Sequence, residues 1–401
     1  MKYVESIRGL RKFLAQYWQA AFALIIIGSV GVVSLLTSHA GTPTAQIEVE
    51  NGTVAGNAAT ISDISASADT AVRFNAPNTY RLPFIHPYAQ DSPYNTPLAV
   101  TATYESANDE KSAWINAKST SGTINSVYWS VNMAQAKVTD PLVTVTHKST
   151  GAVLAANIRV PADFQPPQAT GTLTPDANSV IVQSDGYTAY EFYKFEKFSD
   201  TDWRATRVVK QDLRAGGITS GIRACGNSLA NGLIRATEAT AGSIPHALAI
   251  SIPETGLKLT PLATDGQVSS NGKAVWPCNT QDTQVPGQLE YSGPIPMGTL
   301  FALPQSFNVS SLGLSGSALA VAKAAQQYGV FVTDRSSSIA LYAEPTTASS
   351  DVTAIKAAWK QIIPQLRRVT NETSTNVGGG TGSVQRLAPL APPFDPSIPG
   401  L

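Results

Sequence analysis

The chain has 401 residues, 28 basic and 28 acidic side chains, and 43% apolar residues. This length accommodates one large domain or two smaller ones, and the apolar fraction supplies a sizeable core, which excludes global disorder. A formal net charge of zero lacks the electrostatic footprint that phosphate backbones attract, so we expect no nucleic-acid partner. Charged residues make up only 14% of the chain, below the typical share of about 25%, and such neutral polar surfaces are common outside the cell.

An uncharged apolar run lies near the N-terminus, at residues 20–36. Four basic residues precede this run, and none follows it until Arg73. The positive-inside bias therefore places residues 1–12 in the cytoplasm and the rest of the chain outside the cell membrane. We expect residues 13–37 to be either a transmembrane anchor, because the run is just long enough to span, or a signal segment cleaved near Ala40.

Cys225 and Cys278 would then lie in a compartment that permits disulfides. A bond between them would close a loop of roughly 50 residues and contribute about 4 kcal/mol through the unfolded state. Two unpaired buried thiols are the alternative. Two cysteines exclude a zinc site built from cysteines, and the four histidines show no ligand spacing, so we expect no metal and no cofactor.

Small and polar residues fill the next stretch, residues 38–75, where we expect a linker with a β-hairpin. Residues 45–50 alternate β-branched and polar side chains before Asn51-Gly52, which predicts a strand followed by a turn. The stretch IEVENGTVAGNAATISDISASADTAVRF, residues 47–74, resembles the opening strands of family 6 and 35 carbohydrate-binding modules. The resemblance implies a hairpin derived from such a module, without a working glycan site.

The main part of the chain, residues 76–345, carries short strand candidates separated by Gly, Pro and Asn. This rhythm indicates a mainly β domain of the β-sandwich or jelly-roll type. The clearest strand candidates are residues 126–132, 142–147, 179–183, 187–198, 247–252, 299–303 and 339–343. Helices do not alternate with these strands in the sequence, which disfavours a parallel α/β fold.

Helical patterns are confined to the C-terminal part of the chain. Residues 315–328 have a polar start and an Ala-rich body, and Gly329 provides the stop signal. We expect a C-terminal helix within residues 346–370, which Pro364 should end or kink. Residues 371–401 lack periodicity and are rich in Gly and Pro, which predicts a flexible tail.

Several short motifs resemble a group of large secreted bacterial β-rich proteins. The matching elements are SPYNTPL at residues 92–98, YEFY at 190–193, NGLIRATE at 231–238, GSIPHAL at 242–248, WP at 276–277 and QYGV at 327–330. An Asp-x-His motif of that group reads Asp176-Ala177-Asn178 in this chain, so the histidine is replaced. The resemblance implies an extracellular β-rich fold and no known reaction.

Residues 187–198, YTAYEFYKFEKF, predict a strand with a carboxylate beside aromatic rings. Alternation along a strand places Glu191, Tyr193, Phe195 and Lys197 on one face. Aromatic rings stack on sugars, and a carboxyl group in a partly apolar cleft has a raised pKa that suits proton donation. Glu191 is therefore our candidate general acid or nucleophile, and Tyr193 a candidate substrate-binding residue. The alternative is a solvated charged strand with its aromatic side chains in the core.

Further candidates lie in the surrounding sequence. His246, at the start of an apolar strand, is the candidate assisting acid or base, or else it bonds a loop carbonyl. The guanidinium of Arg235 suits a uronate carboxylate, or else it pairs internally with Glu238. Asp185 is a substrate-binding candidate. Together with Asp176 and Glu238, it is also a source of the second carboxylate that glycoside hydrolysis needs about 5 to 9 Å away.

These observations predict an exported β-sandwich protein, membrane-anchored through its N-terminal helix or secreted, that engages extracellular or cell-wall polysaccharide. In its catalytic form it would be a glycoside hydrolase or lyase. The rival prediction is a non-catalytic surface adhesin or envelope scaffold. Two carboxylates at the separation of a glycosidase pair, at the base of an open cleft, would favour the enzyme.

Overall fold

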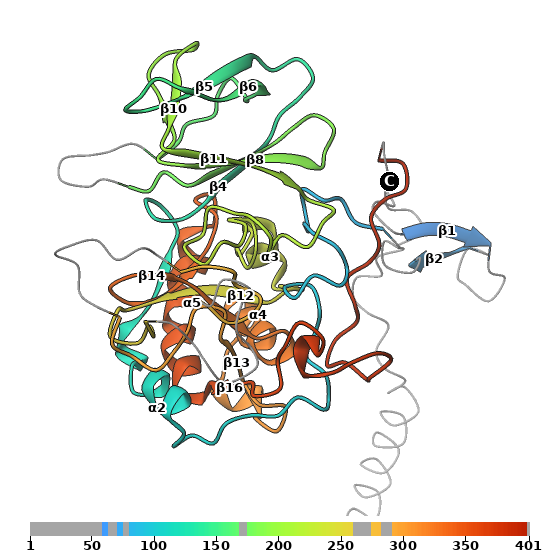
Figure 1. Ribbon diagram of the computed structural model, residues 1–401. Coiled ribbons are helices and arrows are strands. Elements are labelled where there is room, and N and C mark those ends of the chain that lie inside the picture. Colours follow the sequence, from blue (N-terminus) through green and yellow to red (C-terminus); the bar gives the residue numbers. More distant parts are fainter. Residues whose placement is uncertain are drawn as a thin grey trace, which may run out of the picture. The chain divides into compact units, whose positions relative to one another are not determined.

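The computed structural model divides the chain into two compact units, Met1–Asn78 and Thr79–Leu401. It describes residues 58–62, 70–74, 80–167, 175–259, 274–281 and 291–398 (Figure 1).

An antiparallel strand pair is the described part of the first unit. Strand β1 (Ala58–Ser62) pairs with β2 (Thr70–Phe74) over their full lengths. The second strand contains the Val-x-Phe return of the module-like stretch. The strand expected at residues 45–50 and the apolar run at residues 20–36 lie outside the described residues. Within the described ranges, no helix has the length and apolar character that crossing a membrane requires.

The second unit contains more strand than helix. Its strands are β3 (Gly122–Asn125), β4 (Asn132–Gln135), β5 (Leu142–His147), β6 (Val153–Arg159), β7 (Ser179–Val182), β8 (Thr188–Tyr193), β9 (Glu196–Lys197), β10 (Trp203–Ala205), β11 (Arg207–Asp212), β12 (Leu248–Ile252), β13 (Leu300–Ala302), β14 (Val330–Arg335), β15 (Ile339–Tyr342) and β16 (Arg367–Arg368). Its α-helices are α2 (Glu110–Asn116), α3 (Ala236–Ala241), α4 (Gly316–Gln327) and α5 (Ser349–Ile362).

These strands form three mixed sheets. Their orders are β6-β5-β10-β9, β11-β8-β7-β4 and β16-β13-β14-β12-β15-β3. Each sheet contains at least one parallel pair: β5 with β10, β4 with β7, and both β12 with β14 and β15 with β3. The mainly β character of the domain is confirmed, and the β-sandwich or jelly-roll type stays a prediction. The expected strand at residues 126–132 is misplaced, because β3 and β4 lie on either side of a connecting loop there.

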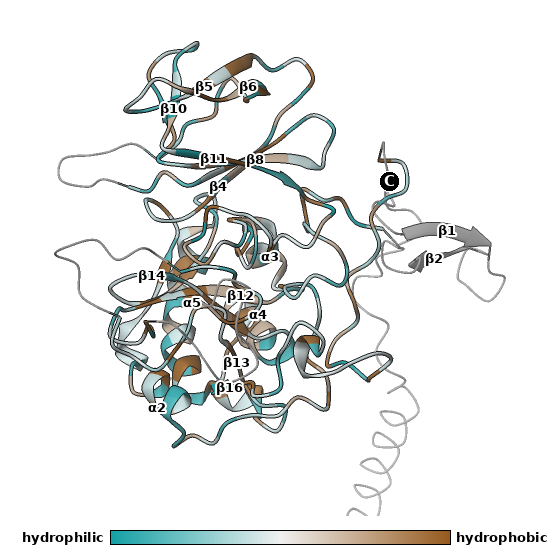
Figure 2. Ribbon diagram, viewed as in Figure 1, coloured by the Kyte–Doolittle hydropathy of each residue, from teal (hydrophilic) through white to brown (hydrophobic). Residues whose placement is uncertain are grey.

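Helices α4 and α5 share the largest core with the six-stranded sheet, and their hydrophobic stretches appear as brown ribbon in Figure 2. Both helices end as the sequence predicts. Gly329 follows α4 with a φ of +86°, and Pro364 lies in the 3₁₀ turn after α5. The indole nitrogen of Trp359 on α5 donates to the Ile339 carbonyl at 3.0 Å, which ties the helix to β15.

A second core joins the two four-stranded sheets. In it Phe192 of β8 stacks on Phe195, with ring centroids 4.0 Å apart, and Trp203 of β10 stacks on Phe195 at 5.1 Å. The expectation that Phe192 and Phe195 lie on opposite faces is wrong. Lys194 between them has a φ of +53°, which ends β8 and resets the alternation of side chains.

The C-terminal segment, residues 371–398, belongs to the second unit and forms hydrogen bonds with earlier segments of it, whereas the sequence predicts a flexible tail. Arg386 forms a β-bridge with an earlier segment, and its guanidinium donates to the Pro97 carbonyl at 2.8 Å. Further along, Phe394 forms a bridge with Arg81. Because the segment bonds to irregular loops and not along a helix or sheet, its sequence carries no periodic signal.

Candidate functional site

Glu191, the predicted general acid, is fully enclosed with 0% exposure. Its Oε1 accepts hydrogen bonds from the Ser228 hydroxyl and, at 3.1 Å, from the Leu229 N–H. Its Oε2 accepts from the Ile222 N–H at 3.1 Å. Burial raises the pKa of this carboxyl to about 7. Through these hydrogen bonds, Glu191 of β8 holds residues 222–229 against the strand. Its burial argues against contact with a polymer, and catalysis by Glu191 stays a prediction.

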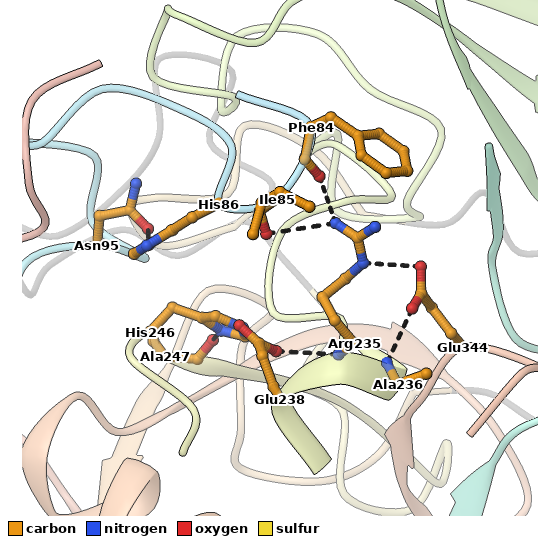
Figure 3. A network of polar contacts seen from close by, with 10 residues as sticks. All are labelled: Phe84, Ile85, His86, Asn95, Arg235, Ala236, Glu238, His246, Ala247 and Glu344. Atoms are coloured by element: carbon orange, nitrogen blue, oxygen red, sulfur yellow. Dashed lines mark hydrogen bonds and ion pairs between the residues drawn. The ribbon is translucent and has the colours of Figure 1, made fainter. Parts of the chain in front are cut away.

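The predicted acid/base His246 and clamp Arg235 belong to one buried polar network (Figure 3). His246 Nε2 lies 3.1 Å from Glu238 Oε2, and its Nδ1 lies 2.8 Å from the carbonyl of Ala247. Arg235 Nε donates to Glu344 Oε1 at 2.7 Å, and the backbone N–H of Arg235 donates to Glu238. Each of these polar groups thus has an internal partner. The histidine bonds a carbonyl, as in its structural alternative, whereas the guanidinium of Arg235 pairs with Glu344 and not with the expected Glu238.

The pKa shifts within this network favour a charged pair of Glu238 and His246 beside a neutral His86 ring. Burial lowers the pKa of His246, but the attraction of Glu238 outweighs it and the net pKa is raised. Burial likewise opposes ionisation of Glu238, yet the attraction of His246 lowers its pKa overall. Burial, followed by repulsion from His246 at a ring separation of 6.1 Å, lowers the pKa of His86 to about 4. The network is satisfied from within, which is typical of a structural ion pair.

Asp185 and Tyr193 lie at opposite ends of β8. Asp185 Oδ1 accepts hydrogen bonds from the N–H groups of Tyr187 and Thr188 at 3.0 and 2.8 Å, so this carboxylate shapes the turn that precedes β8. Tyr193 ends the strand and lines a cavity, which is described below. The structure therefore does not bring these two predicted substrate-binding residues together.

Cys225 and Cys278 lie side by side as buried free thiols. Burial, followed by a hydrogen bond with Cys225, raises the pKa of Cys278 well above its usual value. The Asn227 side chain also lies 3.8 Å from the Cys278 sulfur. The two side chains are neighbours, as a disulfide requires, and the bond itself stays a prediction.

Two adjoining cavities, of about 510 and 550 Å³, have four lining residues in common: Asp176, Asn178, Asp334 and Arg335. We call these two cavities together the polar groove. The first cavity is also lined by Asn125, Trp129, Glu254, Ser336, Ser337, Ser338 and Tyr342. The second is also lined by Tyr193, Thr206, Arg207, Ile222, Arg223, Ala224, Thr280 and Gln281.

Irregular backbone presents one wall of the polar groove. Asp176 and Asn178 flank Ala177, which has a φ of +46°, just before β7 begins. The Asp176 carbonyl accepts a 2.6 Å hydrogen bond from Lys194, the other left-handed residue near this wall. A non-glycine residue in this region of φ and ψ costs about 1–3 kcal/mol, and such strain clusters at functional sites.

The opposite wall comes from the end of the six-stranded sheet. Asp334 and Arg335 are the last residues of β14, and Glu254 follows β12, which runs parallel to β14. Arg335 Nη1 lies 3.9 Å from Glu254 Oε1. Side chains after neighbouring parallel strands meet at one sheet edge, which is where ligands bind in open α/β sheets.

Aromatic side chains complete the polar groove. Trp129 is 41% exposed, Tyr193 is half-buried, and Tyr342 is buried. Carboxylates and an amide beside aromatic rings provide hydrogen bonds for hydroxyl groups and flat surfaces for sugar rings. In the described ranges, no three His, Cys, Asp or Glu side chains are grouped so that they could hold a metal ion.

The sequence points to two residues that line this groove, Tyr193 as a substrate-binding candidate and Asp176 as a source of the second carboxylate. It gives no role to Asn178, which stands where the similar proteins have a histidine, and no pattern in it points to Trp129. A sequence pattern that could have pointed to Asp334 is the run Val-Phe-Val-Thr followed by Asp-Arg, because it is typical of a buried strand that ends in charged residues.

The second unit is thus a mixed-sheet domain with helices on its largest sheet and a polar groove at the end of that sheet. No family model, no curated protein and no solved structure matches this chain.

Proposed function

We propose that this chain is an exported polysaccharide-engaging protein and that the polar groove is its glycan-binding site. The observation that carries the proposal is the convergence of Asp176, Asn178 and Asp334 on both cavities, with Trp129 and Tyr193 beside them. In this proposal the N-terminal apolar segment exports the chain or anchors it in the membrane. The two four-stranded sheets with their shared core form the sandwich part of the domain.

The size and chemistry of the groove support a sugar ligand. Its cavities of about 510 and 550 Å³ fall in the usual range for small-molecule sites, about 300–1,000 Å³. Sugar hydroxyls donate to carboxylates and accept from amides, whereas the apolar faces of sugar rings pack on aromatic side chains. In the catalytic form of the proposal, Asp176 and Asp334 take the roles that the sequence suggested for Glu191 and a second carboxylate.

The test uses the full-length chain in detergent, with a panel of bacterial wall and capsular polysaccharides. Binding is measured by affinity electrophoresis. Cleavage of either kind gives new reducing ends, and unsaturated uronates distinguish β-elimination by a lyase from hydrolysis. We expect at least one polysaccharide to bind, and Asp176→Asn and Asp334→Asn each to weaken that binding at least tenfold. Asp200→Asn is the matched control, because the Asp200 side chain is 94% exposed in the loop between β9 and β10. Unchanged binding in both groove variants would overturn the proposal.

The second candidate function is a non-catalytic adhesin that uses the same groove. The enclosure of Glu191 and the internal pairing of His246 favour it, because these predicted catalytic groups have structural partners. Binding without any new reducing or unsaturated ends would assign this function. Cleavage that is lost in Asp176→Asn or Asp334→Asn would assign the enzyme.

A further inference from the structure

Arg223 is a buried arginine in the wall of the second cavity. Its exposure is 2%, and its guanidinium lies over the ring of Tyr342 at 3.8 Å. One nitrogen, Nη2, lies 3.4 Å from the Leu229 carbonyl. The other two nitrogens, Nε and Nη1, are buried and have no hydrogen-bond partner within the described residues. A buried guanidinium with unused donors is uncommon, because removing an ion from water without a partner is costly.

The buried carboxylate of Glu191 does not supply the missing acceptor. Glu191 lies close enough to Arg223 for the two charges to interact, yet its oxygens accept from Ser228, Leu229 and Ile222. With its pKa raised to about 7 by burial, this carboxyl is also only partly ionised near neutral pH. Arg223 therefore keeps two hydrogen-bond donors without an acceptor among the described residues at the cavity wall.

The other charged residues of this cavity are of both signs. Arg207 and Arg335 add positive charge, whereas Asp176 and Asp334 add negative charge. Arg335 also faces Glu254, at 3.9 Å. The cavity thus combines a guanidinium that needs an oxyanion with carboxylates that accept hydroxyl groups. Asn178 adds a second unused group, because its Oδ1 is buried and accepts no hydrogen bond from the described part of the chain.

We propose that Arg223 binds the carboxylate of a uronic-acid residue, so that the groove selects acidic polysaccharide. A uronate carries in one ring both the oxyanion that Arg223 lacks and the hydroxyls that Asp176, Asn178 and Asp334 can bind. Hydrogen bonds between an arginine and a carboxylate are about twice as strong as neutral ones, which is sufficient for discrimination. The inference rests on the proposed function, because it names the substrate class of the same groove.

The experiment compares polyuronates with matched neutral polymers on the full-length chain in detergent. Polygalacturonate and galactan form one pair, and the methyl ester of polygalacturonate is the third ligand, since it keeps the polymer backbone and removes the charge. We expect polygalacturonate to bind at least tenfold more tightly than the other two. Arg223→Met should abolish this preference, and Arg223→Lys should retain part of it. Arg204→Met is the charge-matched control, because Arg204 is 38% exposed and does not line either cavity.

Each outcome decides the inference. If the acidic polymer, its ester and the neutral polymer bind equally to the unmodified chain, the uronate inference is wrong while the groove remains a glycan site. A preference that survives in folded Arg223→Met also overturns the inference. Failure of every polysaccharide in the wider panel to bind would remove the proposed function as well. The ester comparison needs no variant, so it decides the question even if Arg223→Met does not fold.

Discussion

Two buried arginines in this domain have opposite surroundings. Arg235 is 6% exposed, pairs with Glu344 at 2.7 Å and donates to the carbonyls of Phe84 and Ile85. Arg223 is 2% exposed, yet its Nε and Nη1 have no hydrogen-bond partner among the residues that the structure describes, and its guanidinium lies over an aromatic ring. The first is held by an enclosed network, and the second lies in the wall of a cavity. Burial alone therefore does not separate a structural charge from a binding charge, whereas the completeness of hydrogen bonding does.

The largest expected effect is a contrast in stability between Arg235→Met and Arg223→Met. Loss of Arg235 leaves Glu344 buried without its ion-pair partner, so we expect the free energy of unfolding to fall by about 3–5 kcal/mol. Loss of Arg223 removes an unpaired charge, so we expect no fall and up to a few kcal/mol of gain. Urea unfolding of the full-length chain in detergent measures both. Equal destabilisation by the two variants would remove the distinction between the two arginines.

A disulfide between Cys225 and Cys278 would fix the segment that presents Arg223. We expect the chain, expressed with export to an oxidising compartment, to contain this bond, because the two thiols are neighbours in the fold. Reducing it should lower the free energy of unfolding by about 4 kcal/mol. Thiol counting in denaturant, with and without reductant, checks the bond directly. Two free thiols in the exported, unreduced protein would show that the two cysteines pack as buried thiols without a bond between them.

The pH dependence of stability reports on Glu191, the acid that leaves Arg223 unpaired. Its pKa is about 7 in the folded chain, against 4.5 as the ordinary value. The folded state therefore binds this proton more tightly than the unfolded state does. The contribution of Glu191 to the free energy of unfolding is fully present below pH 4.5 and is lost as pH rises through about 7. The expected loss is about 3 kcal/mol between pH 4.5 and 8.

Glu191→Gln provides the reference for this measurement, because the variant lacks the titrating group. The stability difference between the unmodified chain and Glu191→Gln should fall across that pH range, and a flat difference would contradict the assigned environment. Glu372, whose pKa burial raises to about 8, titrates in both proteins and cancels. The variant also tests the sequence-based role of Glu191, since polysaccharide cleavage that disappears in a folded Glu191→Gln protein would restore it as a catalytic residue.

The smallest expected effect concerns the strained backbone beneath the polar groove. Lys194 adopts a φ of +53°, where glycine is favoured, so Lys194→Gly should raise the free energy of unfolding by about 0.5–1 kcal/mol. Lys210→Gly, within strand β11, is the matched control and should lower it by a similar amount. Thermal unfolding measures both. A destabilised Lys194→Gly protein would show that the lysine side chain, which lies over Tyr193, outweighs the strain.

Local patterns in the sequence identified individual elements better than their arrangement. Strand β5 matches its predicted bounds, and helices α4 and α5 end beside Gly329 and Pro364 as expected, because these signals depend on neighbouring residues. The parallel pairing of β12 with β14 depends on residues about 80 positions apart (Leu248 pairs with Val330), and no local pattern encodes it. The left-handed Lys194 was likewise invisible in a run of aromatic and charged residues.

The same limit applies to the candidate site. Residue type and strand position point to Asp176 and Tyr193, and both line the groove. They also point to Arg235, whose side-chain partner Glu344 is 109 residues away in the sequence, so sequence spacing does not reveal the pair. Asp334 joins the groove only through the pairing of β14 with β12.

The bridge between Arg81 and Phe394 brings the two ends of the second unit together. The Arg81 N–H donates to the Pro393 carbonyl at 2.9 Å, and the Arg81 carbonyl accepts from the Asp395 N–H at 3.0 Å. A domain whose ends are neighbours can be circularly permuted with a short connecting peptide, or inserted into a loop of another protein.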